Sequence, residues 1–359
     1  MMNILYQAKK YNEITNELLK KLYAEKENQN IVVSPFSIYM LMAIAADATQ
    51  DETRDEIIKA LTRNLTFDEA MELVRWLQDA LTNNNALTSC NAICVSHSIE
   101  DSILKEYPEH LRQSLKGEVF TSEDIVTDVN NWANKNTNGL IDKIADDTMA
   151  NMLLCMLNAT AFVGEWTQTY TEFDIEECPF HNSDGTTSQV DMIDTTENEY
   201  IEDDFFTGFV KPYKDIGYSF MALLPKDESL MMLDDLSFSD LFVTRKDEQV
   251  FVTMPEFTYS FDEDLTSFCE SIGIHQIFTD KANFYPLTTL QLSVDAIVHK
   301  ARIEVNREGT KAAAVTMSAL RSGPVFFDRK EVNLDRPFIY AIMHNETGMP
   351  VFTGIVNQL

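Results

Sequence analysis

The hydrophobic period of this chain changes between its two halves, and this change limits the possible fold more than any other feature. In the first half, apolar residues recur at the spacing of amphipathic helices, in segments 14–26, 37–48, 53–63, 67–81 and 128–144. In the second half, residues rich in Val, Ile, Phe and Tyr form strand-like runs, in segments 218–226, 248–261, 292–305, 337–344 and 349–356. One helical segment, 264–273, interrupts those strands. The pattern predicts a mixed α+β fold.

The composition is that of a globular protein with a large core. Of the 359 residues, 45% are hydrophobic and 24% are charged, which excludes disorder of the whole chain. The length alone allows two or three domains, but the sequence contains no internal repeat, no low-complexity tract and no linker rich in Pro or Ser. We therefore expect a single domain over residues 1–359.

The charge balance excludes several classes of partner. Lys and Arg number 28 against 58 Asp and Glu, so the net charge is −30, which disfavours binding to nucleic acid or to an anionic membrane. No apolar run approaches the ~20 residues of a membrane span, and residues 1–10 contain no apolar signal-peptide core. The sequence does not decide the compartment. We expect an extracellular protein if an export signal has been removed, and otherwise a cytoplasmic one.

Residues with metal or nucleophile chemistry are scattered along the chain. No C-x-x-C pair and no histidine at metal-ligand spacing accompanies the cysteines, so we expect free thiols, no metal and no cofactor; the cysteines are Cys90, Cys94, Cys155, Cys178 and Cys269. The motifs of phosphate-binding loops, dinucleotide sites, zinc proteases and serine hydrolases do not occur. An enzyme would need a Ser-His-Asp triad assembled from distant residues, which is the least favoured hypothesis.

Two polar residues occur within apolar, strand-like sequences. His299 lies in segment 292–305, where a buried imidazole needs hydrogen-bond partners. Asn158 begins an N-x-[ST] sequon, but it falls in segment 153–166, whose apolar sequence predicts an interior strand. A glycan is incompatible with that burial, so we interpret this sequon, and those at Asn64 and Asn345, as accidental.

Residues 307–330, REGTKAAAVTMSALRSGPVFFDRK, interrupt the strand-rich half with small side chains. The alanines suit an exposed helix, and the composition also suits a flexible linker or an extended segment able to become a strand. In the extended form, Lys311 and Arg321 share one face, and the opposite face is small and uncharged, formed by Thr310, Ala312, Ala314, Thr316, Ser318 and Leu320. Gly309 would provide a hinge, because it lacks a Cβ. The residues themselves leave all three alternatives open.

Motifs along the whole chain resemble those of the serpin family of serine protease inhibitors. The similar stretches follow the family's order: NIVVSPFSIYMLMAIAADAT, NTNGLIDKI, LLCMLNATAFVGEW, VKPYKDIGYSFMALLPKD, VHKARIEVNREGTKAAAVT and DRPFIYAIMHNETGMPVFTGIV. The resemblance implies the α+β serpin fold, with three β-sheets, about nine helices and an exposed reactive-centre loop at about residues 307–330.

By the same resemblance, the chain is a monomeric inhibitor that is consumed by its target and is not an enzyme. A serine protease attacks the loop and forms a covalent acyl-enzyme, and the cleaved loop then inserts into the main sheet before the ester is hydrolysed. Serpin loop insertion is itself a standard example of strand addition and released strain. The expected targets are elastase-like or trypsin-like proteases. The alternative is a non-inhibitory serpin that acts as a binding protein or chaperone.

The resemblance also assigns roles to individual residues. The hinge of the loop corresponds to Glu308, Gly309, Thr310, Lys311, Ala312, Ala313, Ala314, Val315 and Thr316. A polar cluster beneath the main sheet, the shutter, corresponds to Ser34, Ser37, Asn158 and His299, and the breach at the top of that sheet corresponds to Trp166. Inhibitory members usually carry acidic residues beside the hinge glycine, whereas this chain has Arg307 and Lys311. We expect modest damage, because Lys311 faces outward, but this basic hinge is the main reason to consider a binding protein.

The scissile bond is expected in the second part of the loop, among Leu320, Arg321, Ser322, Gly323, Pro324, Val325, Phe326 and Phe327. The family's usual position, about fourteen residues beyond the hinge glycine, gives Gly323–Pro324, a poor bond because proline lacks the amide hydrogen. Three neighbouring bonds suit other proteases: Arg321–Ser322 a trypsin-like enzyme, Val325–Phe326 an elastase-like one and Phe326–Phe327 a chymotrypsin-like one.

Overall fold

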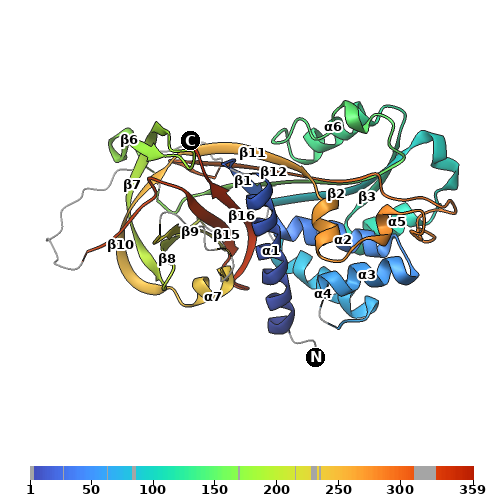
Figure 1. The fold of residues 1–359 in the computed structure, drawn as a ribbon, viewed down its shortest axis with the longest axis horizontal. Coiled ribbons are helices and arrows are strands. Elements are labelled where there is room, and N and C mark those ends of the chain that lie inside the picture. The colour runs from blue at the N-terminus through green and yellow to red at the C-terminus, as the bar shows by residue number, and fades with distance from the viewer. Residues whose placement is uncertain are drawn as a thin grey trace. The chain divides into compact units, whose positions relative to one another are not determined.

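The computed structural model describes residues 4–26, 28–62, 64–82, 86–168, 170–214, 216–227, 233, 236–310 and 329–359. Most of the α-helix precedes residue 137 and most of the strand follows residue 153 (Figure 1), as the hydrophobic period predicts. The contacts divide the chain into two compact units. Residues 1–14, 34–161 and 261–302 form the first, and residues 15–33, 162–260 and 303–359 form the second. The expectation of a single domain stays a prediction.

One helix of the first unit, α2, shows how a capping residue sets a helix start. Ser34 accepts a hydrogen bond from the backbone N–H of Ser37, and Pro35 occupies the first helical position of α2. Every residue of α2 is buried, as expected for a helix that is apolar on all sides. The helices placed wholly in this unit are α2 (Pro35–Asp47), α3 (Asp51–Leu61), α4 (Phe67–Leu81), α5 (Tyr107–Leu115), α6 (Ile125–Asn136) and α8 (Thr266–Ser271).

A sheet packs against α6 in the first unit. Its strands follow the order β3 (Glu118–Ser122), β2 (Leu87–Ser96), β4 (Leu154–Phe162) and β12 (Ala296–Asn306), and β11 (Phe257–Asp264) pairs with β12. All nine residues of β4 are buried, which confirms the interior strand predicted around Asn158. Apolar residues of β2, β4 and β12 form one buried cluster with Val129, Trp132 and Ala133 of α6.

The helix predicted over residues 128–144 is wrong at both ends. The observed α6 begins earlier because Asp124 caps it, accepting a hydrogen bond from the N–H of Thr127 at 3.2 Å. It ends at Asn136 because Asn138 and Gly139 adopt φ of 53° and 78°, the left-handed conformation that terminates helices. The following residues are irregular chain whose apolar side chains join the same buried cluster, and the side chain of Asn130 accepts hydrogen bonds from the N–H groups of Ile144 and Ala145.

The second unit contains a nine-stranded sheet. The strand order is β1 (Ile31–Val33), β16 (Met349–Val356), β15 (Phe338–His344), β9 (Tyr218–Pro225), β8 (Phe206–Pro212), β7 (Thr187–Glu202), β10 (Lys246–Pro255) and β14 (Lys330–Asn333), with β6 (Ile175–His181) also paired to β7. The long strand β7 joins two groups, because residues 187–193 pair with β6, residues 192–200 with β10 and residues 199–202 with β8. One group consists of β6, β10 and β14, and the other of β8, β9, β15, β16 and β1. Counted separately, these two groups and the sheet on α6 correspond to the three sheets expected.

The remaining elements are short or shared. The second unit also contains β5 (Gly164–Glu165), β13 (Gly309–Thr310) and α7 (Phe238–Val243), while α1 (Ile4–Glu25) contributes residues to both units. In the described part of the chain, no helix is long and apolar enough to cross a membrane. All five cysteines are free, and the described residues include no group of three acidic, Cys or His side chains that could hold a metal.

Candidate functional site

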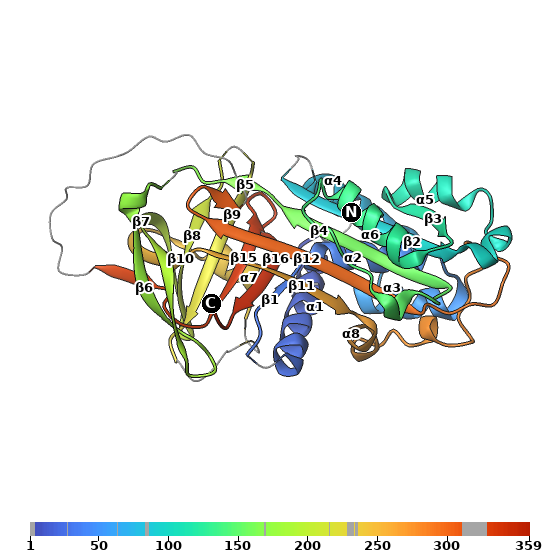
Figure 2. The same ribbon diagram turned by 90° about the horizontal axis from the view of Figure 1, so that it is seen from above.

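Two parallel strands of the first unit pair directly with each other. Strands β4 and β12 lie side by side (Figure 2). Residues 155–161 of β4 pair with residues 296–302 of β12, and His299 stands opposite Asn158. Strands paired in this way lie about 4.8 Å apart, so no third strand lies between them along these residues. Separating β4 from β12 would free one hydrogen-bonding edge on each, and an added strand could pair with both edges.

A buried polar cluster links β2, β4 and β12. Asn158 is fully buried and accepts a hydrogen bond from the Nδ1–H of His299 at 2.7 Å. Its own Nδ2 donates to Oδ1 of Asn91 at 2.9 Å and to the carbonyl of Cys90 at 3.3 Å. On the other side of the ring, Nε2 of His299 accepts from the backbone N–H of Ser34 at 3.2 Å. Both ring nitrogens therefore have partners, as a buried histidine requires.

These contacts keep His299 neutral. Burial lowers the pKa of its imidazole from 6.5 to about 3, because the charged form would lose its hydration. The N–H of Ser34 fixes Nε2 as an acceptor, so the ring proton must lie on Nδ1. Protonation of Nε2 would bring two donors together and break the hydrogen bond to the start of α2.

Hydroxyl groups extend this cluster. The Oγ of Ser37 lies 2.9 Å from Oγ of Ser34, 2.9 Å from Oγ of Ser89 and 3.0 Å from Oγ1 of Thr160. Thr160 in turn donates to the carbonyl of Thr88 at 2.8 Å. Side chains from α2, β2, β4 and β12 thus form one network, and movement of β4 away from β12 would break the Asn158–His299 bond within it.

The structure brings together all four residues that the sequence predicts for this cluster: Ser34, Ser37, Asn158 and His299. It also adds residues that the sequence analysis missed. Ser89 and Asn91 lie two positions apart on β2, and Thr160 lies two positions from Asn158 on β4. Polar residues at this spacing inside apolar strands share one face, and that was the available signal. The role of the cluster as a shutter stays a prediction.

The beginning of the loop segment is held in the second unit. Gly309 and Thr310 form β13, which pairs antiparallel with β12 on one side and with β5 on the other. Thr310 is fully buried, and its hydroxyl lies 2.7 Å from Oη of Tyr213. Gly309 has φ of 151°, and a Cβ on it would lie 2.1 Å from the carbonyl oxygen of Gly164. Glycine is therefore required here for close approach as well as for its backbone angle.

Trp166 covers the backbone that leads into β13. Its Nε1 donates to the carbonyl of Asn306 at 2.8 Å, and its backbone N–H donates to the carbonyl of Glu308 at 3.0 Å. The indole also stacks on the ring of Tyr213, with centroids 4.5 Å apart and planes inclined by 12°. The tryptophan predicted for the breach thus contacts the residues predicted for the hinge, although its role during insertion is not tested by these contacts.

Arg307, the basic residue that departs from the family pattern, has acidic partners. Its Nη2 lies 2.8 Å from Oε2 of Glu256 and its Nε 3.1 Å from Oε1, while its backbone N–H donates to the same carboxylate at 2.6 Å. A carboxylate oxygen of Asp191, Oδ2, lies 3.8 Å from Nη2 of Arg307. The hydrogen bonds to Glu256 raise the pKa of the guanidinium above its usual value. The positive charge beside the hinge is therefore balanced within this chain.

A buried ion pair next to this region was not predicted. Lys211 is 1% exposed, and its Nζ lies 2.7 Å from Oε1 of Glu197 and 5.1 Å from the ring centroid of Trp166. Lys211 also donates to Oη of Tyr170, whose backbone N–H bonds the carbonyl of Arg307 at 3.2 Å. Removing one partner of such a pair would leave an uncompensated buried charge, so we expect substitution of either residue alone to destabilise this region.

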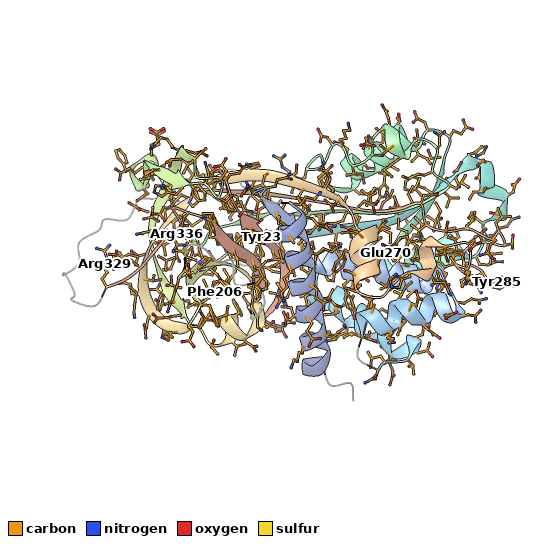
Figure 3. All side chains as sticks on the ribbon, in the orientation of Figure 1. Tyr23, Phe206, Glu270, Tyr285, Arg329 and Arg336 are labelled. Carbon is orange, nitrogen blue, oxygen red and sulfur yellow. The ribbon has the colours of Figure 1, made fainter. Side chains whose placement is uncertain are left out.

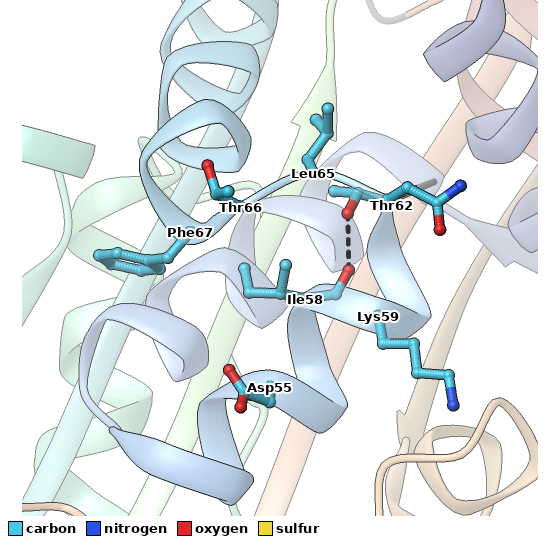
Figure 4. Close-up of a pocket in the computed structure, with 8 residues that line it drawn as sticks. Asp55, Ile58, Lys59, Thr62, Leu65, Thr66 and Phe67 are labelled. Carbon is cyan, nitrogen blue, oxygen red and sulfur yellow. Dashed lines mark hydrogen bonds between the residues drawn. The ribbon is translucent and has the colours of Figure 1, made fainter.

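The other predicted loop residues, 311–316 and 320–327, lie outside the described residues. After them the chain is described again from Arg329 (Figure 3), whose guanidinium carbon lies 3.5 Å from the ring centroid of Phe251. A cavity of about 190 Å³ lies between the end of α3 and the start of α4 (Figure 4). Its lining includes Asp55, Lys59 and Phe67 but none of the predicted site residues.

Comparison with known proteins agrees with this arrangement over the whole chain. Iripin-2 of Ixodes ricinus is 28% identical over 382 aligned positions, which cover 98% of this chain and 93% of that protein. The crystal structure of the thermophilic serpin tengpin in its native state is 30% identical, with a TM-score of 0.89, and the match covers 100% of this chain and 95% of tengpin.

Two further results concern the fold and the family. Thyroxine-binding globulin in complex with thyroxine has the same fold, with a TM-score of 0.86 at 21% identity, over 98% of both chains. Residues 9–359 match the family described as Serpin (serine protease inhibitor). This chain, with its α+β fold and its sequence motifs in family order, belongs to the serpin family.

Proposed function

We propose that this chain is an inhibitory serpin, which traps a serine protease by inserting its own cleaved reactive loop into the sheet that contains β4 and β12. One observation carries the proposal: β4 pairs directly with β12, so the place of an added strand between them is not filled. A serpin whose loop had already inserted fully would not have this pairing.

The trap depends on ordinary acyl-transfer chemistry supplied by the protease. The catalytic serine oxygen attacks a loop carbonyl, the peptide bond breaks, and the new amine leaves with the proton that the protease histidine returns to it. An ester then joins the loop to the protease. Insertion of the loop must outrun hydrolysis of this ester, and the distorted protease then stays attached.

The free energy for insertion comes from new strand pairing. Roughly 15 inserted residues would add ladder hydrogen bonds of about 0.5–1.5 kcal/mol each, or ~10–20 kcal/mol in total. A charged or bulky side chain on the inward face would offset this gain through desolvation or overpacking. The full burial of Thr310 supports the assignment of the small face, which begins at this residue, as the inward one.

The target is a serine protease, with elastase-like enzymes preferred over trypsin-like ones. Val325–Phe326 offers a small apolar residue before the bond and a longer tether, whereas Arg321–Ser322 offers a basic residue and a shorter tether. The runner-up function, a binding protein or chaperone, depended on the basic hinge. The ion pair between Arg307 and Glu256 weakens that alternative, because it gives the basic residue a structural partner.

Incubation with trypsin, chymotrypsin and elastase tests the proposal. We expect at least one protease to form a complex that survives boiling in SDS, and mass spectrometry of the released fragment should show a new N-terminus at Ser322, Phe326 or Phe327. Cleavage by all three proteases without any stable complex would refute inhibition and favour a binding protein. Turnover of a small ester substrate would instead indicate an enzyme.

A further inference from the structure

A cavity of about 290 Å³ lies in the second unit where β7 and β8 stop pairing with each other. The last residues of this ladder are Glu199 and Val210. The next residues of each strand, 197–198 and 211–212, line the cavity without pairing with each other, because β7 pairs there with β10. The cavity therefore results from the divergence of two strands of the sheet.

The lining includes a buried carboxylate that uses only one of its two oxygens. Glu197 is 7% exposed, and its Oε1 accepts hydrogen bonds from Nζ of Lys211 at 2.7 Å and from Oγ1 of Thr195 at 3.0 Å. Its Oε2 has no hydrogen-bond partner among the described residues, although both oxygens of a carboxylate can accept. A buried oxygen without a donor costs free energy, which a donor group inside the cavity would offset.

Further donors and acceptors line the same cavity. Nε of Arg245 lies 3.0 Å from Oε1 of Glu199, and Nη1 of Arg245 donates to the carbonyl of Phe242. Asn345 accepts a hydrogen bond at Oδ1 from Oγ of Ser219 at 2.8 Å. Within the described part of the chain, Oε2 of Glu199, Nη2 of Arg245 and Nδ2 of Asn345 have no partner. The cavity thus offers unused acceptors and unused donors together.

These groups select the class of ligand. The described lining residues include two basic side chains and two carboxylates, so the lining is neutral and favours neither a cation nor an anion. A hydroxyl group both donates and accepts, whereas an ammonium group only donates and a carboxylate only accepts. Glu197 and Glu199 share one face of β7 and lie roughly 7 Å apart along it, a spacing that the hydroxyl groups of a six-membered ring can bridge.

We propose that this cavity binds a small neutral cyclic polyol of the size of a monosaccharide. Its volume of about 290 Å³ is at the lower end of the range of ligand pockets, ~300–1,000 Å³, and admits a single ring. Val210 and Pro212 of the lining provide an apolar surface for the C–H face of that ring. The site is independent of the proposed function, because it requires neither a protease nor a cleaved loop.

Saturation-transfer NMR on the intact chain tests the site, with myo-inositol, D-glucose, D-galactose and D-mannose as probes. We expect at least one probe to bind with a dissociation constant of about 1 mM, and the charged analogues glucosamine and glucuronate to bind more weakly. Asn198→Trp should fill the cavity from its exposed rim and abolish binding. Glu199→Gln, which cannot accept at its new amide nitrogen, should weaken binding about 5- to 10-fold. Glu177→Gln, an exposed change on β6 outside the lining, should leave binding unchanged.

Three results would overturn the site: no saturation transfer to any of the four neutral probes at about 50 mM, binding to both lining variants within about twofold of wild type, or tighter binding of a charged analogue than of every neutral probe. Circular dichroism establishes that each variant is folded. If Asn198→Trp does not fold, Asn345→Ala replaces it and should weaken binding about 5-fold through loss of the Nδ2 donor. Because no protease is present, failure of the proposed trap would leave these results unchanged.

Discussion

At the scale of single residues, His299 makes the stability of the protein depend on pH. The folded-state pKa is lowered to about 3 from 6.5, so the unfolded chain binds more protons between these values. Stability is therefore complete above pH 6.5 and declines as the pH falls toward 3, by about 1.4 kcal/mol per pH unit from this group. Below pH 3 both states are protonated and the loss stops.

Urea unfolding of wild type and His299→Gln between pH 7 and pH 4 measures this contribution. The stability advantage of wild type should shrink as the pH falls, because glutamine does not titrate. The exposed His275 provides the control, and His275→Gln should leave the pH dependence of wild type in place. A constant difference between wild type and His299→Gln at every pH would rule out the neutral, buried histidine described here.

Gly309 is a second residue whose identity is fixed by its surroundings. Ala at this position would place a Cβ 2.1 Å from the carbonyl of Gly164, so we expect β13 to detach at a cost of about 1–3 kcal/mol. Trp166 reports this change, because it bonds the hinge backbone; its fluorescence can be isolated with Trp76→Phe and Trp132→Phe. Gly185→Ala is the matched control, since Gly185 also has positive φ but no atom near its Cβ position. Identical emission from Gly309→Ala and wild type would contradict the tight fit.

At the scale of secondary-structure elements, the ion pair between Arg307 and Glu256 anchors the segment between β12 and β13. Arg307→Glu or Glu256→Arg alone places like charges together and should lower the melting temperature. The double variant restores opposite charges and should recover most of the loss, with a coupling free energy of about 1 kcal/mol for this partly exposed pair. Additive effects of the two single changes would show that the pair does not hold the hinge.

The sequence predicted elements well where local signals decide their ends. The helix expected over residues 67–81 has these bounds, because Thr66 and Glu69 form a capping box. The helix expected through Ile144 fails for an equally local reason: Asn138 and Gly139 take left-handed angles, although the apolar residues beyond them keep helical spacing. Apolar periodicity continues past a helix end when the following irregular chain packs on the same core.

The candidate site was predictable only in part. Ser34, Ser37, Asn158 and His299 were predicted because they match family motifs, and Asn158 and His299 also stand out as polar residues within apolar strands. The partner of Arg307 was not found, because Glu256 lies 51 residues away in sequence and no local pattern connects them. The buried pair of Lys211 and Glu197 was missed for the same reason, since burial of a charge is decided by tertiary packing.

At the scale of the whole molecule, the proposed trap depends on free energy stored in the intact chain. The native chain keeps β4 paired with β12, and the inserted form would gain an additional strand. The free-energy difference between the two forms, ~10–20 kcal/mol, would stay stored in the intact protein until a protease cuts the loop. The rate of loop insertion, which releases this energy, would depend on the loop composition, the hinge and the polar cluster.

The melting temperature before and after a single cut in the loop tests this most directly. A protease that cleaves without forming a complex produces the cut chain, and calorimetry compares it with the intact protein at the same pH. We predict that the cleaved chain melts roughly 20 °C higher or more, given the added strand. An unchanged melting temperature, with the loop shown to be fully cleaved, would contradict the account.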